Sequence, residues 1–209
     1  MKIRNLLKSM LLVGVMFITQ QASAQAVMVE NFDYTEGSTL VSNGWVAHSG
    51  AETNSPVVAP GLTFQGYMGS GIGGSAALVN NGEDVHRTFD VMESGSVYAS
   101  FIVNIEATNA AGYFFHFAPS NVTTIFYTRV WAKADGTGLG IGQSAPATYA
   151  TVTPGTPTLV VVKLDLATKV SSLYVFNTFP TSEPATADAT YTEAESVSSV
   201  GAVGLRQFN

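Results

Sequence analysis

The chain contains no cysteine, so no disulfide holds its fold together and no cysteine-linked lipid anchors it. Charged residues are scarce as well, at 11% of the sequence, and acidic residues outnumber basic ones by 15 to 9. Nucleic acids and anionic membrane surfaces reward clustered Lys and Arg, which this sequence lacks. We therefore expect neither of them as a partner.

The sequence has no apolar run of the about 20 residues that a membrane span requires. The apolar run Met10–Ile18 follows three basic residues and precedes the small-residue sequence Ala22–Ala24. This order is typical of a secretory signal peptide. We predict that residues 1–24 are cleaved and that a secreted, extracellular chain without a membrane span begins at Gln25.

The sequence also lacks a helical hydrophobic stripe of useful length. Instead, short runs of alternating polarity recur: the odd-numbered residues of 97–105 and the even-numbered residues of 160–166 are all apolar. Because strand side chains alternate between faces, each run places its apolar residues on one face of a sheet. Asp135–Gly136 predicts a hairpin between two such runs. The pattern predicts an all-β, antiparallel two-sheet sandwich formed by a single domain over residues 25–209.

The eleven residues Asn80–Asp90 are unusually rich in charge for this sequence. In the alternating run that they contain, Arg87 shares a face with apolar neighbours, so the run is not a clean buried strand. We predict a turn at Asn81–Gly82, with Glu83 and Asp84 in solvent. The strand that follows is predicted to be an edge strand that Arg87 guards against further pairing.

The chain closes on a strand-like run at residues 199–209. Together with other segments, this run resembles a family of secreted bacterial concanavalin A-like or laminin-G-like jelly-roll domains. The segments that carry the resemblance are residues 29–50, 82–89, 95–105, 113–119, 159–166 and 173–177. In that family a further strand follows the closing run. The resemblance therefore implies a two-sheet jelly roll that lacks its last strand, in a C-terminally truncated chain.

The resemblance also implies a function, because such domains bind carbohydrate on a concave sheet face or act as spacers and adhesion modules. Relatives often hold one structural calcium ion at the edge of the sandwich, bound by carboxylate and backbone oxygens. In this sequence, Glu30 and Asp33 are the predicted calcium ligands. No other cofactor is expected.

The same architecture hosts glycoside hydrolases and polysaccharide lyases, so the residues must distinguish these classes. Retaining glycosidases need two carboxylates close together on one strand face. Only Glu193 and Glu195 have a suitable spacing, and their segment is loop-like. A lyase needs a base and a charge-neutralising group. His116 and Arg129, with a tyrosine, meet that need on neighbouring predicted strands, so a polysaccharide-active enzyme is the alternative hypothesis.

Two further sequence patterns resemble binding motifs but do not predict a binding site. The run Gly69–Gly74 matches G-x-G-x-x-G, but no helical pattern follows it, so we interpret these glycines as turn residues. The three histidines, His48, His86 and His116, are far apart and lack the short spacing of zinc ligands. We therefore predict no zinc site.

Sugar recognition uses aromatic rings with polar side chains beside them, although about half of such aromatics are expected in the core. Six residues are the candidate ligand-binding set: Tyr98, Asn104, His116, Tyr127, Arg129 and Trp131. The leading hypothesis is a non-catalytic extracellular β-sandwich that serves as a recognition or structural module. Its expected partners are glycans or other cell-surface components.

Overall fold

The computed structural model describes residues 25–106 and 110–207, so the predicted signal peptide lies outside the described residues. The described chain forms thirteen strands and one short 3-10 helix, η1 (Val41–Asn43). None of its helical segments has the length and apolar character needed to cross a membrane. The predicted all-β class is confirmed.

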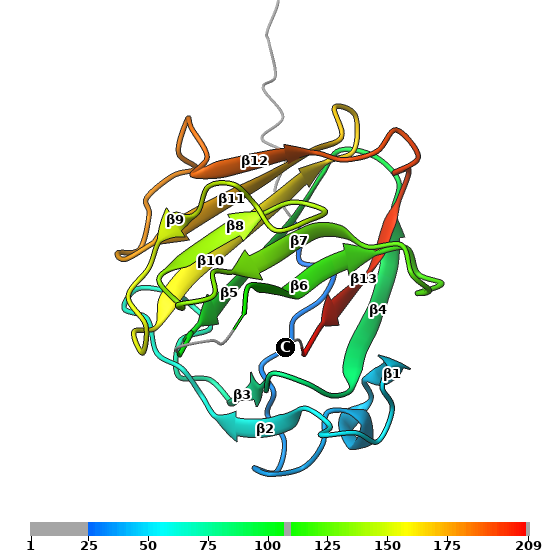
Figure 1. The fold of residues 1–209 in the computed structure, drawn as a ribbon, viewed down its shortest axis with the longest axis vertical. Helices are drawn as coiled ribbons and strands as arrows, with labels where there is room; N and C mark the ends of the chain where they lie inside the picture. Colours follow the sequence, from blue (N-terminus) through cyan, green and yellow to red (C-terminus); the bar gives the residue numbers. More distant parts are fainter. Residues whose placement is uncertain (1–24, 107–109, 208–209) are drawn as a thin grey trace, which may run out of the picture.

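The larger sheet is antiparallel and has seven strands in the order β1-β4-β13-β6-β7-β8-β9 (Figure 1). Its strands are β1 (Val46–Ser49), β4 (Asp84–Met92), β13 (Val200–Leu205), β6 (Gly112–Ala118), β7 (Tyr127–Ala132), β8 (Gly138–Ile141) and β9 (Ala150–Thr151). Neighbours in this sheet are often distant in sequence. Strand order, not chain order, therefore determines which side chains meet.

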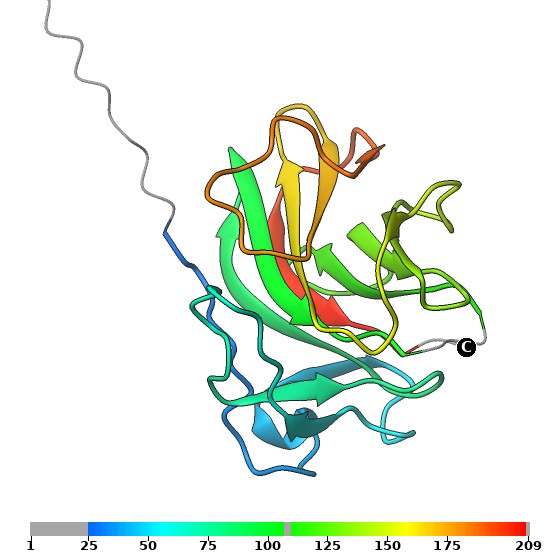
Figure 2. The same ribbon diagram turned by 90° about the vertical axis from the view of Figure 1, so that its left-hand side faces the viewer.

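The second sheet has four antiparallel strands in the order β12-β11-β10-β5 and packs against the first (Figure 2). Its strands are β12 (Ala189–Thr192), β11 (Val170–Phe176), β10 (Thr158–Asp165) and β5 (Ser96–Val103). A two-stranded sheet, β2 (Val57–Pro60) with β3 (Gly74–Ala77), lies at the lower end of the sandwich in Figure 1. The predicted antiparallel two-sheet sandwich is confirmed.

The main hydrophobic core lies between the two large sheets. It contains the apolar side chains that alternation predicts, including Val97 and Phe101 from β5 and Val160 and Leu164 from β10. Burying one such side chain contributes about 1.5 to 3 kcal/mol, so this layer is the main favourable term for the fold. The predicted hairpin is also present, with Gly136 at φ 71° between β7 and β8.

A second, smaller core lies where the N-terminal segment and the two-stranded sheet pack on β1 and β4. Leu40, Trp45, Val58 and Val85 form it. The glycine-rich run enters this region as turns, as predicted: Gly73 has φ 68°, and a Cβ there would lie 2.1 Å from the Asn31 carbonyl oxygen.

The prediction of an edge strand at residues 84–90 is wrong. β4 lies between β1 and β13 and pairs with both. Glu83 and Asp84, predicted in solvent, are only 2% and 8% exposed. The Oε2 atom of Glu83 accepts a 2.7 Å hydrogen bond from the Glu52 amide, and Asp84 accepts a 2.9 Å bond from the Gln207 amide. Backbone donors brought by other segments make this burial possible.

The closing run forms β13, which pairs with β4 on one side and β6 on the other. The missing last strand that the resemblance implies stays a prediction. The segment around Glu193, interpreted as a loop, contains the short strand β12, which pairs with β11.

Candidate functional site

All three histidines of the chain meet on the outer face of the seven-stranded sheet, the face turned away from the four-stranded sheet. The His48 ring centroid lies 5.3 Å from that of His86 and 5.5 Å from that of His116. Phe126 packs against the cluster, with its ring 4.1 Å from that of His116. Sequence spacing gave no sign of this cluster, because the three residues come from β1, β4 and β6.

The strand register explains the convergence. Gly204 in β13 lies opposite His86 on one side and opposite His116 on the other. A Cβ at position 204 would lie 2.1 Å from the His116 Nε2 atom, so only glycine leaves room for that ring. A register shift in β1 between Ala47 and Ser49 falls at His48. Such an irregularity changes the face to which a side chain points, compared with a strand that alternates regularly.

Bulges in β6 and β7 extend the same face. The register of this pair shifts between Tyr113 and Phe115, and Phe114 and Phe115 both pack in or against the core. Tyr113 and His116, three residues apart, consequently lie on the same outer face with their ring centroids 5.8 Å apart. Trp131 joins them, with its ring 5.4 Å from that of Tyr113.

Two arginines lie over this surface. The guanidinium of Arg206 is 4.2 Å from the Tyr113 ring centroid, and that of Arg129 is 4.9 Å from the same centroid. Asp84 is the nearby acid, with its Oδ2 atom 3.7 Å from the Arg206 Nε. We call this surface the histidine face; its residues are His48, His86, Tyr113, His116, Arg129, Trp131 and Arg206.

The histidine face holds buried polar atoms that have no hydrogen-bond partner among the residues that the structure describes. They include both ring nitrogens of His48 and of His116, the Nδ1 of His86 and the Nε of Arg129. His116 is 0% exposed and His86 is 9% exposed. Leaving a buried donor or acceptor unpaired costs about 1 to 3 kcal/mol, so native proteins hold few of them. Six such atoms lie together on this one surface.

Burial lowers the pKa of all three imidazoles. Desolvation, together with the neighbouring His86 and Arg206 charges, lowers the pKa of His48 to about 4. Desolvation also holds the pKa of His116 well below its ordinary value, with His48 and Arg129 acting in the same direction. The pKa of His86 is lowered by desolvation, against a backbone hydrogen bond to Val46. At neutral pH each ring therefore carries one N–H donor and one free lone pair.

A buried polar network positions Arg129. Its NH1 atom donates a 2.9 Å hydrogen bond to the Gln143 carbonyl oxygen, and the Gln143 side chain donates a 2.8 Å bond to Glu193. Glu193, 3% exposed, also accepts a 2.8 Å bond from the amide of Thr128, whose φ is 52°. This carboxylate therefore holds the bulge that comes directly before Arg129.

The structure brings together three of the six predicted ligand-binding residues, His116, Arg129 and Trp131. Tyr127 is buried in the core between the sheets, and Asn104 is exposed beyond the end of β5. Tyr98 lies on the outer face of the four-stranded sheet, where it donates a 3.0 Å hydrogen bond to Glu183. The predicted ligand-binding set did not include His48, His86, Tyr113 and Arg206. Only the strand order, which the sequence does not reveal, places them beside His116.

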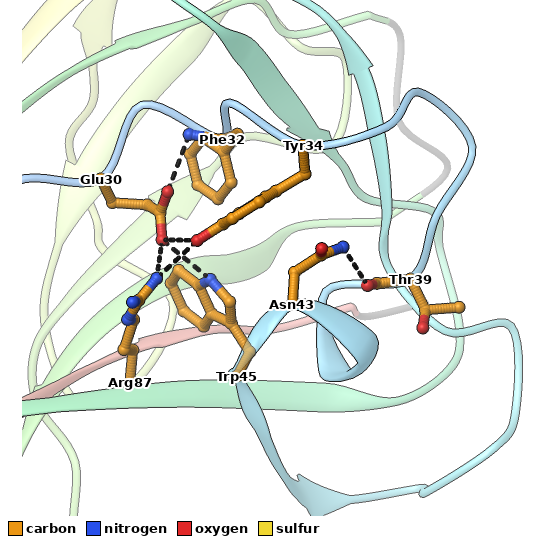
Figure 3. Close-up of polar contacts among 7 residues, drawn as sticks. All are labelled: Glu30, Phe32, Tyr34, Thr39, Asn43, Trp45 and Arg87. Atoms are coloured by element: carbon orange, nitrogen blue, oxygen red, sulfur yellow. Dashed lines mark hydrogen bonds and ion pairs between the residues drawn. The ribbon is translucent and has the colours of Figure 1, made fainter.

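Glu30, a predicted calcium ligand, lies in a different polar cluster, shown in Figure 3. Its Oε2 atom pairs with Arg87 and accepts hydrogen bonds from the Tyr34 hydroxyl (3.0 Å) and the Trp45 Nε1 (3.2 Å). Its Oε1 atom accepts a 2.7 Å bond from the Phe32 amide. Protein donors thus engage both oxygens.

The second predicted ligand, Asp33, is exposed. The described residues contain no group of three or more His, Cys, Asp or Glu side chains arranged to hold a metal ion. The calcium prediction gains no support from this geometry and stays a prediction.

The lyase alternative needs a base that reaches the substrate. His116, Arg129 and Tyr113 do converge, as that alternative requires. However, the His116 ring is fully buried beneath its neighbours, so it cannot contact a polysaccharide in this conformation. In this conformation His116 therefore does not serve as the base that the lyase alternative requires.

No protein-family model and no curated protein matches the sequence. Among solved structures, the chain is similar to the T. cruzi calreticulin globular domain, with 9% identity and a TM-score of 0.45 over 78% of this chain and 77% of that one. It is also similar to lectin I-B4 from Griffonia simplicifolia, with 13% identity and a TM-score of 0.42 over 83% and 90%.

Arcelin-5, a lectin-like defense protein from Phaseolus vulgaris, is a third similar structure. It shares 11% identity and a TM-score of 0.41, over 79% of this chain and 84% of that one. These lectin-like neighbours are distant. Their likeness concerns the sandwich fold and says nothing about a ligand of this chain.

Proposed function

We propose that the chain is a non-catalytic, extracellular recognition module that binds a glycan on the histidine face. The observation that carries this proposal is the convergence of aromatic rings, guanidinium groups and unpartnered imidazole nitrogens on one sheet face. Sugar sites combine these elements, because rings pack on the apolar face of a sugar and polar groups bind its hydroxyls.

The exposed part of the face has the chemistry that a sugar needs. His48, Arg129, Trp131 and Arg206 are all partly exposed. The Trp131 Nε1 donates a 2.7 Å hydrogen bond to the Gly142 carbonyl oxygen, which fixes the indole in place. A fixed ring loses little conformational entropy when a ligand packs on it.

On the outer face of the four-stranded sheet, the polar side chains at the centre are bonded to one another. There Glu183 accepts hydrogen bonds from Tyr98 (3.0 Å), Lys163 (3.0 Å) and Tyr174 (3.1 Å). These side chains satisfy one another, so a ligand would have to break existing bonds. This contrast supports the histidine face as the binding surface.

Affinity electrophoresis and glycan arrays with residues 25–209 test the proposal. Trp131→Ala should lower glycan affinity by about 5- to 30-fold, because a stacked aromatic ring contributes about 1 to 2 kcal/mol at such a site. Trp131→Phe keeps a ring and should retain part of the binding. Circular dichroism must show that each variant is folded.

Tyr98→Ala is the matched control, since it removes an exposed aromatic ring from the opposite face of the sandwich. It should leave affinity unchanged within about twofold. The proposal fails if no glycan binds, which leaves a structural module. It also fails if Tyr98→Ala abolishes binding while Trp131→Ala does not.

A further inference from the structure

We infer that the group bound at the histidine face is an anion, a carboxylate or a sulfate carried by an acidic glycan. This inference rests on the proposed glycan-binding function and specifies its ligand class. It follows from the local charge, from the hydrogen-bonding groups that lack partners, and from the way the arginines are held.

The local charge of this face is opposite to that of the whole chain. Acidic residues exceed basic ones by 15 to 9, so most of the surface repels an acidic polymer. On the histidine face, two guanidinium groups lie within 5 Å of the Tyr113 ring centroid, and Asp84 is the acid beside them. An acidic polymer is therefore directed to this face.

The N–H groups without a partner suit a ligand that accepts hydrogen bonds. The Nε–H of Arg129 is an obligatory donor, and it is buried without a partner among the described residues. The neutral imidazole of His48, which is partly exposed, adds one N–H. Carboxylates and sulfates accept several such bonds at once, whereas sugar hydroxyls accept fewer and carry no charge.

The guanidinium of Arg129 is pre-positioned for an anion. Its NH1 atom is bonded to the Gln143 carbonyl oxygen, and Gln143 is itself held by the Phe126 carbonyl oxygen and by Glu193. Binding an anion therefore requires little ordering of this side chain. A divalent cation fits poorly here, because both arginines repel it.

Binding of an anion at this position should also make the neighbouring imidazoles take up protons. The groups that face the cluster are His48 from β1, His86 and Asp84 from β4, Tyr113 and His116 from β6, Arg129 from β7, and Arg206 after β13. Without ligand, burial and these positive neighbours lower the imidazole pKa values. A bound anion favours the imidazolium form and raises those values, so binding takes up protons and tightens as pH falls.

Three polysaccharides of similar length test the inference: a polyuronate, a sulfated polysaccharide and a neutral glucan. The acidic polymers should bind at least about tenfold more tightly than the glucan, and 0.5 M salt should weaken this binding. Comparing the two acidic polymers identifies the carboxylate or the sulfate as the recognised group. Affinity should rise from pH 7.5 to pH 5.5, a range in which uronate groups with pKa of about 3.5 to 4 stay ionised.

Arg129→Gln should lower affinity for the acidic polymer by about 10- to 100-fold, as expected for a hydrogen bond to a charged group. Lys163→Gln is the matched control: it removes the same charge from the outer face of the four-stranded sheet and should change affinity less than twofold. His48→Gln should flatten the pH dependence. Thermal unfolding must show that all three variants remain folded.

Equal losses in Arg129→Gln and Lys163→Gln would overturn the inference, because they would show only general charge attraction. The inference would also be overturned if the glucan bound as tightly as the acidic polymers and Arg129→Gln had no effect. If Trp131→Ala abolished that binding, the proposed function would nevertheless stand. Failure of every polymer to bind removes the proposed function, and the inference with it.

Discussion

Two adjacent residues of β4, His86 and Arg87, point to opposite faces of the same strand and enter opposite kinds of polar cluster. Arg87 meets Glu30, whose two oxygens accept bonds from four different protein groups (Figure 3). His86 joins a cluster in which ring nitrogens have no partner in the described part of the chain. The same strand thus supports a satisfied network and an unsatisfied one.

The two clusters differ in whether their polar atoms are hydrogen-bonded to other residues of the described chain. The Glu30 cluster fastens the N-terminal segment to β4 and covers the smaller core, with the Phe32 and Trp45 rings stacked beside it at 5.9 Å. The histidine face contains buried ring nitrogens without a partner among the described residues, and such groups cost stability. Removing side chains from the two clusters should therefore have opposite consequences.

The largest expected effect is the loss of Glu30. Glu30→Ala removes the carboxylate that pairs with Arg87 and accepts three further hydrogen bonds, and it should lower the free energy of unfolding by about 3 kcal/mol. Asp33→Ala, an exposed acid in the same segment, should change it by at most about 0.5 kcal/mol. Urea denaturation measures both. Equal costs for the two variants would contradict a structural role for the Glu30 cluster.

The second effect tests how the histidine face is built. Gly204→Ala places a methyl group against the His116 ring and should destabilise the fold by about 1 to 3 kcal/mol. In a His116→Ala background, the same substitution has room and should cost at least about 1 kcal/mol less. A double-mutant cycle by urea denaturation measures this coupling. Additive costs would show that the two residues do not share this space.

A smaller effect of opposite sign is expected from His116→Phe. Phenylalanine keeps a ring against Phe126 but removes two buried nitrogens that lack partners. The free energy of unfolding should rise by up to about 1 kcal/mol, while ligand affinity stays within about twofold because the buried ring does not touch the ligand. Thermal unfolding and the glycan assay measure the two quantities. A clear loss of stability would mean that the imidazole is satisfied in solution.

Stability should also depend on pH, with a smaller share from His48 than from the buried His116, because His48 is partly exposed and solvent screens its charge. The folded protein lowers the pKa of His48 to about 4 and also lowers those of His86 and His116, so the unfolded chain binds protons more readily. Their contribution is complete above the unfolded value of about 6.5 and is lost as pH falls toward the folded values.

Melting temperatures from pH 8 to pH 4.5 measure this dependence, and His48→Gln should reduce the slope. Asp84 acts in the opposite direction near the acid end, since desolvation raises the pKa of its carboxyl. A melting temperature that stays constant between pH 7 and pH 5 would contradict neutral buried imidazoles.

Much of the fold was predictable from short-range pattern. The alternation in residues 97–105 and 160–166 identified core strands, and Asp135–Gly136 identified a hairpin, because side-chain direction in a strand depends only on position parity. The same rule failed for β4. Arg87 on an apolar face suggested an edge strand, but a carboxylate 57 positions earlier in the chain pairs with it.

The candidate site was only half predictable. His116, Arg129 and Trp131 could be selected as polar and aromatic residues on strands, but Tyr98 and Tyr127 were equally plausible choices. The bulges at His48 and around Phe115 depend on how two strands pair, and a single strand's sequence does not contain that information.

By itself, the sequence determined the all-β class, the alternating faces and several turns, since each depends on neighbouring residues. Only the tertiary structure decided that β1, β4, β13 and β6 lie side by side, with Gly204 making room between His86 and His116. The physical reason is that pairing of distant strands is a long-range choice, made by burial of the whole sheet. That choice assembled the three histidines into one face.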